Sequence, residues 1–174
     1  MDVLFGDVVT VDGDAQLAVS TGNGKQVFKQ INNVRVESIE ETDGTRLVTF
    51  NLQENDISSY DEDIMAAAKT HKKEWFGREV KDSVIDKAYH SPVDNGIFTT
   101  TQHTGMTCWN HQKEIVDNSD LTEGMVCSVV VELKRILFYK KSFEPEWLSV
   151  QVRIPEPPAP DPYSGYLFQD DDNQ

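Results

Sequence analysis

Tight-turn signals between short β-forming runs place the strongest constraint on how this chain can fold. Near the N-terminus, Val8–Val11 is followed by Asp12-Gly13. Further along, Asp43-Gly44 separates Asn33–Ile39 from Thr45–Asn51. Asp-Gly is a favoured central pair for the two-residue turns that join antiparallel strands. The first fifty residues therefore predict a meander of antiparallel strands.

A helical pattern begins near Ser59. Ser59 and Glu62 have the spacing of a capping box, which marks a helix N-terminus, and Gly77 is a suitable residue to end this helical stretch. A second helix is expected from about Glu79 to Tyr89, where apolar side chains recur on one face. The sequence thus predicts two helices between two groups of strands.

Two long strands follow, at Met125–Lys140 and Trp147–Ile154. Alternation gives each strand one apolar face and one face that mixes aromatic, polar and basic residues. The mixed face of the first strand is predicted to present Ser128, Val130, Glu132, Lys134, Ile136, Phe138 and Lys140. The mixed face of the second is predicted to present Trp147, Ser149, Gln151 and Arg153.

The order of elements favours a β-rich fold with a helical insert, namely an OB-fold-like, partly open Greek-key barrel with elaborated loops. A two-sheet sandwich of the jelly-roll type fits the pattern nearly as well. Residues 1–154 are expected to form one domain. Residues 155–174 are expected to form a proline-rich linker, with five prolines among its first eight residues, and an acidic disordered tail.

The charge of the chain is unevenly distributed. Its net charge of −14 argues against a nucleic-acid partner, because phosphate binding depends on Lys and Arg. Residues 65–153, however, contain 12 acidic and 12 basic residues, so the excess acidity lies toward the two ends. This distribution weakens the argument from net charge.

Several features predict an intracellular protein that does not span a membrane. Two cysteines and the lack of an Asn-x-Ser/Thr sequon fit a reducing compartment. The N-terminus has no basic-then-apolar leader, and no apolar run reaches the length of a membrane span.

No pattern of catalytic residues stands out. His103, Cys108 and His111 have a permissible spacing for zinc, but Cys127 or His90 would have to supply the fourth ligand without a spacing that recommends it. A Cys-His nucleophile pair lacks an orienting acid and an oxyanion loop. Phosphate-binding loops and His-Glu-x-x-His are absent. We therefore expect a protein that is not an enzyme and uses no metal or cofactor.

Basic and aromatic residues gather in two short segments, Lys69–Arg78 and Lys134–Lys141. Proteins that bind single-stranded nucleic acid need cations for the phosphates and flat aromatic faces for unstacked bases. These segments could provide both. They could equally be core aromatics with solvating lysines.

Three segments, Lys72–Gly77, Glu132–Phe143 and Trp147–Val152, resemble the OB-fold single-stranded DNA-binding proteins of large nucleocytoplasmic DNA viruses. The resemblance covers roughly residues 65–154. It implies coating of single-stranded replication, recombination or repair intermediates without a cofactor, in the cytoplasm or nucleus of the host cell. The positions that match the family pattern are Lys134, Phe138, Lys140 and Trp147. The full set of predicted nucleic-acid-binding residues is Lys72, Lys73, Arg78, Lys134, Phe138, Lys140, Lys141, Trp147 and Arg153.

The C-terminal segment is similar to the acidic tails of bacteriophage single-stranded DNA-binding proteins, which recruit polymerase and helicase and cover the empty DNA groove. The residues predicted to contact replication proteins are Tyr166, Phe168, Asp170, Asp171 and Asp172. Unlike in those proteins, no aromatic residue ends the chain. RNA binding and a homo-oligomer are left open. The alternative is a structural or assembly protein of the virion, with a sandwich domain and a tail that docks on a partner.

Overall fold

Three tight hairpins organise the strands, in a computed structural model that describes residues 3–52 and 57–156. The hairpins join β1 (Val3–Val11) to β2 (Asp14–Thr21), β3 (Val27–Thr42) to β4 (Thr45–Asn51), and β5 (Val93–Asp94) to β6 (Ile97–Trp109). Asp12, Asp43 and Asn95 have φ angles of 52°, 51° and 49°, and each precedes a glycine that also has a positive φ. This is the backbone that type I′ turns require, and it confirms the turns predicted at the two Asp-Gly pairs.

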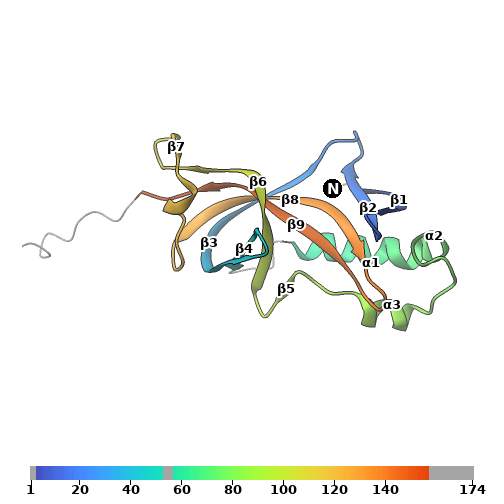
Figure 1. Ribbon diagram of the computed structural model, residues 1–174. Coiled ribbons are helices and arrows are strands. Elements are labelled where there is room, and N and C mark those ends of the chain that lie inside the picture. Colours follow the sequence, from blue (N-terminus) through green and yellow to red (C-terminus); the bar gives the residue numbers. More distant parts are fainter. Residues whose placement is uncertain (1–2, 53–56, 157–174) are drawn as a thin grey trace, which may run out of the picture.

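The other elements are three helices, a short 3₁₀ helix and three further strands (Figure 1). They are α1 (Ser58–Thr70), α2 (Lys72–Phe76), α3 (Asp82–Ala88), β7 (Ile115–Val116), the 3₁₀ helix Asn118–Asp120, β8 (Val126–Phe138) and β9 (Phe143–Arg153). None of the helices in the described part of the chain is long and apolar enough to cross a membrane.

Hydrogen-bonded neighbours form a ring of strands. β8 pairs with β3, β3 with β4, and β4 with β6, all antiparallel. β9 then pairs in parallel with β6 and antiparallel with β8, which completes the ring. The β6–β9 pairing is interrupted between Gln102 and Thr107. The fold is therefore the predicted OB-fold-like, partly open barrel rather than the sandwich alternative.

The helical segment differs from the prediction in its boundaries. Ile57, which is fully buried, occupies the N-cap position of α1, so Ser59 lies inside the first turn and the capping-box prediction is wrong. The helix breaks at His71 before α2. Gly77 ends α2 as predicted, with a φ of 68° and its N–H donated to the carbonyl four residues earlier. α3 begins at Asp82, three residues later than predicted.

The helices lie along one side of the barrel and contribute to its core (Figure 1). Tyr60, Ile64 and Ala68 are the buried side chains of α1. Trp75 of α2 is 6% exposed and packs edge-on against Phe5, with ring centroids 5.4 Å apart. Trp75 is therefore a core residue, as one of the two interpretations of the Lys69–Arg78 segment allowed.

Two β-bulges change the predicted faces of β8 and β9. The β8–β9 register shifts between Leu133 and Arg135, so Lys134 is the extra residue and Ile136 turns into the core. It shifts again where Val130 and Val131 pair with Gln151 and Ser149. A bulge reverses the side on which later residues lie.

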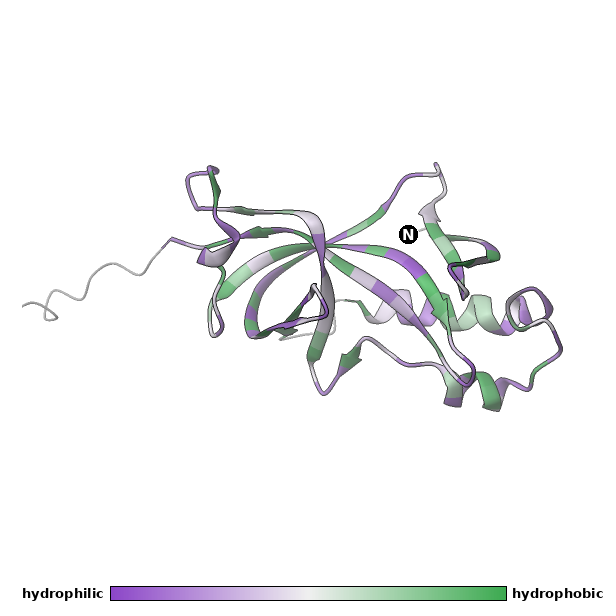
Figure 2. Ribbon diagram, in the orientation of Figure 1, coloured by the Kyte–Doolittle hydropathy of each residue, from purple (hydrophilic) through white to green (hydrophobic). Residues whose placement is uncertain are grey.

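The bulges explain why three residues face inward instead of outward. Ile136, Trp147 and Ser149 are 0%, 2% and 0% exposed. The prediction that they lie on the outer face is wrong. Apolar and polar positions alternate along the barrel strands in Figure 2, and the bulges decide which of them reach the core.

Candidate nucleic-acid interface

A groove crosses the outer face of the barrel over β3, β8, β9 and β6. It consists of two adjoining hollows of about 330 and 480 Å³, which share Val130 and Gln151 in their walls. The second hollow also reaches His103, Gly105 and Thr107, next to the interruption in β6–β9 pairing. The incomplete seam of the barrel therefore adjoins this groove.

Strand register places the groove residues in rows across the sheet. Arg153 pairs with Ser128 on one side and with Trp109 on the other. One step along the strands, Gln151 pairs with Val130. A further step along β8, Glu132 lies opposite Phe28. We call this surface the outer groove, and its principal residues are Phe28, Gln30, Trp109, Lys113, Val130, Glu132, Gln151 and Arg153.

The outer groove combines aromatic rings with cations. Phe28 is 47% exposed, and the half-buried Trp109 is oriented by a 3.0 Å hydrogen bond from its Nε1 to the Thr107 hydroxyl. Lys113 and Arg153 are exposed and form no ion pair with any residue in the described ranges. Their charges are available to an anionic ligand.

The loop that presents Lys113 is held by its own side chains. Asn110 Oδ1 accepts hydrogen bonds of 2.9 Å from the backbone N–H groups of Gln112 and Glu114. Lys113 lies between them with a positive φ of 65°. The loop thus fixes a lysine at one end of the outer groove.

Four predicted residues meet at a different place, the tip of the β8–β9 hairpin. Arg78, Phe138, Lys140 and Lys141 line a hollow of about 460 Å³ between the tip and helices α2 and α3. We call it the hairpin pocket. None of its three cations is ion-paired with another described residue.

Phe138 is part of an aromatic cluster rather than a free stacking platform. Its ring stacks on Phe143 at 5.9 Å and meets Trp75 and Phe76 edge-on at 5.8 and 6.0 Å. Its side chain is half-buried at the wall of the hairpin pocket. The prediction that Phe138 points away from the core is therefore wrong, although part of its surface still borders the pocket.

The two lysines predicted on α2 are already paired with acids. Lys72 Nζ lies 2.5 Å from Asp82, and Lys73 Nζ lies 3.4 Å from Glu79. The hydrogen bond from Lys72 lowers the pKa of the Asp82 carboxyl. These lysines therefore present less net charge to a ligand than the cations of the outer groove.

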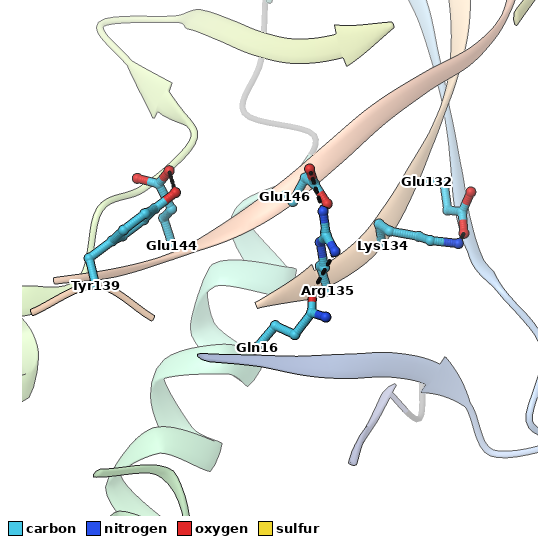
Figure 3. A network of polar contacts seen from close by, with 7 residues as sticks. All are labelled: Gln16, Glu132, Lys134, Arg135, Tyr139, Glu144 and Glu146. Carbon is cyan, nitrogen blue, oxygen red and sulfur yellow. Dashed lines mark hydrogen bonds and ion pairs between the residues drawn. The ribbon is translucent and has the colours of Figure 1, made fainter. Parts of the chain in front are cut away.

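Lys134 lies on β8 between Glu132 of the outer groove and Phe138 of the hairpin pocket, in the polar network shown in Figure 3. Its Nζ is 3.5 Å from the carboxylate of Glu132, and its side chain is 47% exposed. Next to it, Arg135 donates to both carboxylate oxygens of Glu146, at 2.5 and 3.3 Å, and to the side-chain oxygen of Gln16. Arg135 joins three strands, whereas Lys134 remains accessible.

Trp147 lies in the core and stabilises the fold by packing. Its ring contacts Tyr60 at 5.3 Å and Phe98 at 5.9 Å, both edge-on. At 2% exposure it cannot stack on a base. The predicted binding residues of β8 and β9 therefore do not form one surface. Arg153 lines the outer groove, Lys134 is paired with Glu132 of that groove, and Phe138 and Lys140 line the hairpin pocket.

The cysteines are poorly suited to nucleophilic chemistry. Both are buried, and burial raises the pKa of the Cys108 thiol and raises that of Cys127 to about 12. A protonated thiol is a weak nucleophile and metal ligand. No three His, Cys, Asp or Glu residues converge on a metal-binding geometry in the part of the chain that the structure describes.

Sequence reasoning missed Phe28, Trp109 and Lys113. A signal for Phe28 was present: Val27 and Ile31 mark the buried face of β3, so an aromatic at position 28 falls on the opposite face. The sequence around Lys113 contains no comparable signal. This turn residue comes to lie near Arg153 only when β9 pairs with β6. The predicted tail residues Tyr166, Phe168 and Asp170–Asp172 lie outside the described residues.

Comparison with known proteins identifies the fold. A single-stranded DNA-binding protein from bacteriophage Enc34 is similar with a TM-score of 0.51 and 14% identity, over 87% of this chain and 89% of that one. A C-terminal truncation of the Enc34 protein gives 0.52 and 13%, over 92% and 97%. No curated protein matches the sequence. Residues 32–170 match a family of unknown function, DUF5871.

Proposed function

The chain belongs to the family of unknown function DUF5871, and we propose that this member binds single-stranded DNA through its outer groove. The main observation in support of the proposal is that two aromatic and two basic residues lie on one concave face, namely Phe28, Trp109, Lys113 and Arg153. The shared fold with a phage protein named for single-stranded DNA binding supports it.

The chemistry of the outer groove fits a single strand better than a duplex. Unstacked bases need aromatic faces, which Phe28 and Trp109 offer, and the phosphates need cations, which Lys113 and Arg153 offer. In a duplex the base faces are already stacked on one another, so the two rings would gain no partner. Because every base has a stacking face, we propose binding that tolerates most sequences.

The biological role that we propose follows the resemblance of the sequence to viral proteins. Coating single strands would serve replication, recombination or repair of a viral genome, in the cytoplasm or nucleus of the host. The acidic tail would recruit replication proteins, since it places aromatic residues beside carboxylates. Binding of this kind requires no cofactor and no catalytic residue.

The proposal can be tested by anisotropy titration of labelled oligo-dT. If the groove and hairpin cations neutralise about three to five phosphates, the log–log salt slope should be about −2 to −3.5. Lys113→Ala and Arg153→Ala should each weaken binding and reduce the slope by about 0.7. Lys87→Ala, which changes an exposed lysine on α3, is the control. Equal affinity for duplex DNA, or unchanged binding by both groove variants, would contradict the proposal.

One observation favours the alternative of an assembly protein. The edge strand β1 pairs with β2 only, within the described residues, and exposes Leu4, Val9 and Val11 by 51%, 50% and 43%. An exposed apolar edge is suited to pairing with another chain, including a second copy of this one. Light scattering over a concentration series, with and without oligo-dT, would distinguish assembly without DNA from coating of DNA.

A further inference from the structure

We propose that Glu132 gives the outer groove a preference for bases with an exocyclic amino group, cytosine above all, over thymine and uracil. This inference rests on the proposed binding of single-stranded DNA. It names a specificity-determining residue within that site.

Glu132 is a buried acid in the wall of a ligand-sized hollow. Its side chain is only 5% exposed, yet it lines the 480 Å³ part of the outer groove together with Phe28, Gln26 and His103. Most carboxylates at such burial are held by several hydrogen bonds or by a buried cation, since removing a charge from water is costly. Glu132 is not held in this way.

The only interaction of the Glu132 carboxylate within the described ranges is with Lys134. The Nζ–Oε1 distance is 3.5 Å, and the lysine side chain is 47% exposed. No backbone N–H, hydroxyl or amide among those residues donates to this carboxylate. Glu132 therefore retains hydrogen-bond acceptor capacity that a donor entering the groove could use.

The nearest stacking surface lies directly opposite. Glu132 on β8 pairs in register with Phe28 on β3, so the two side chains lie on the same face of the sheet, with Cβ atoms about 5 Å apart. Phe28 is 47% exposed. A base stacked on the Phe28 ring would present its hydrogen-bonding edge to the Glu132 carboxylate.

The edge chemistry of the bases decides which of them fits. Cytosine presents an N4 amino group, a donor that carboxylates accept from. Uracil and thymine present carbonyl oxygens at the equivalent place, which a carboxylate repels. A hydrogen bond to a buried charged group is strong enough to make a difference of about tenfold in affinity.

Oligo-dC and oligo-dU test the inference, because their bases differ in edge chemistry but hardly in size. At mildly alkaline pH, where cytosine is neutral, wild type should bind oligo-dC about tenfold more tightly than oligo-dU. Glu132→Gln, which keeps the shape and removes the charge, should bring the ratio close to one. Glu62→Gln, an exposed carboxylate on α1, should keep the wild-type ratio.

Each of the other possible outcomes either supports or overturns the role of Glu132. Equal wild-type affinity for the two oligonucleotides would overturn the inference while leaving single-strand binding intact, and no binding to either would contradict the proposed function itself. If Glu132→Gln raises both affinities equally, the carboxylate is only a charge that repels phosphate, and the inference fails. Should the variant not fold, wild type can be titrated with oligo-dC dimethylated at N4: binding as weak as oligo-dU supports the role of Glu132, and binding like oligo-dC overturns it.

Discussion

The three tryptophans occupy different environments, and one of them lines the outer groove. Trp75 and Trp147 are buried at 6% and 2% exposure, whereas Trp109 is half-buried beside Arg153. A base stacked on Trp109 should quench its fluorescence. We expect oligo-dT to quench the emission of wild type, and Trp109→Phe to abolish most of the quenching while keeping most of the affinity.

A second tryptophan variant provides the control for this titration. Trp75→Phe would leave the quenching in place, because Trp75 lies in the aromatic cluster beneath the hairpin tip. Quenching that survives in Trp109→Phe would locate the bound strand elsewhere.

Trp147 and Phe28 should respond to alanine substitution in opposite ways. Trp147→Ala removes a ring packed between Tyr60 and Phe98 and should lower the free energy of unfolding by about 3–5 kcal/mol. Phe28→Ala removes an exposed ring and should change stability little, but weaken DNA binding by about 1–3 kcal/mol. Chemical denaturation and anisotropy titration measure the two effects separately.

The opposite pattern, a stable Trp147→Ala protein that no longer binds DNA, would restore the sequence-based assignment. That assignment relied on strict alternation along β9. Alternation is a good guide within an uninterrupted strand, but no signal in the residues around Trp147 reveals the extra residue introduced by a bulge.

At the scale of elements, the basic segments differ in what surrounds them. Lys140 and Lys141 lie at the β8–β9 tip without an ion pair to another described residue, whereas Lys72 and Lys73 on α2 are bound to Asp82 and Glu79. A DNA strand that follows β8 from the outer groove past Lys134 would reach the tip. The two lysine pairs look equivalent in the sequence, but they differ in whether acidic residues already neutralise part of their charge.

We expect Lys140→Ala/Lys141→Ala to weaken binding of a long oligonucleotide and to reduce the salt slope by about 1 to 1.5. Lys72→Ala/Lys73→Ala should have a smaller effect on the slope, because those charges are already partly neutralised. Titrations across a salt series measure both. If the α2 pair has the larger effect, DNA follows the helices and not β8.

The elements themselves were more predictable than their faces. Turn chemistry at Asp12-Gly13 and Asp43-Gly44, and the stop at Gly77, are local properties that short segments encode. The bulge at Lys134 depends on how β8 and β9 match each other over their whole length. For that reason strict alternation placed Trp147 on the same face as Arg153, whereas the structure buries Trp147 in the core and leaves Arg153 exposed at the outer groove.

The choice between barrel and sandwich belongs to the whole molecule. Both have the same order of strands and helices, and they differ in which distant strands meet. Here the decisive contacts are those of β9 with β6 and β8. Such pairings join residues far apart in the sequence, and the pattern of any one segment does not reveal them.

The distribution of charge over the whole chain leads to a prediction about the tail. Residues 157–174 contain four acids and no base, while the outer groove and hairpin pocket are lined by cations that form no ion pair with another described residue. An acidic tail can compete with DNA for such cations. Deleting residues 157–174 should therefore raise the affinity for oligo-dT at low salt.

The gain should disappear as added salt shortens the Debye length below about 8 Å. A variant with Asp170–Asp172 replaced by Asn keeps the length of the tail and should behave like the deletion. Identical affinities of all three proteins at low salt would show that the tail does not compete with DNA.

The position of β9 in the ring has a consequence for biosynthesis. β9 supplies Phe143, Trp147 and Val152 to the core and, among the strands of the described residues, is the last to leave the ribosome. Until then β6 and β8 lack a shared neighbour, and the barrel cannot close around its apolar residues. Folding should thus wait until translation has passed Arg153, and a chain interrupted earlier should be exposed to proteases and chaperones.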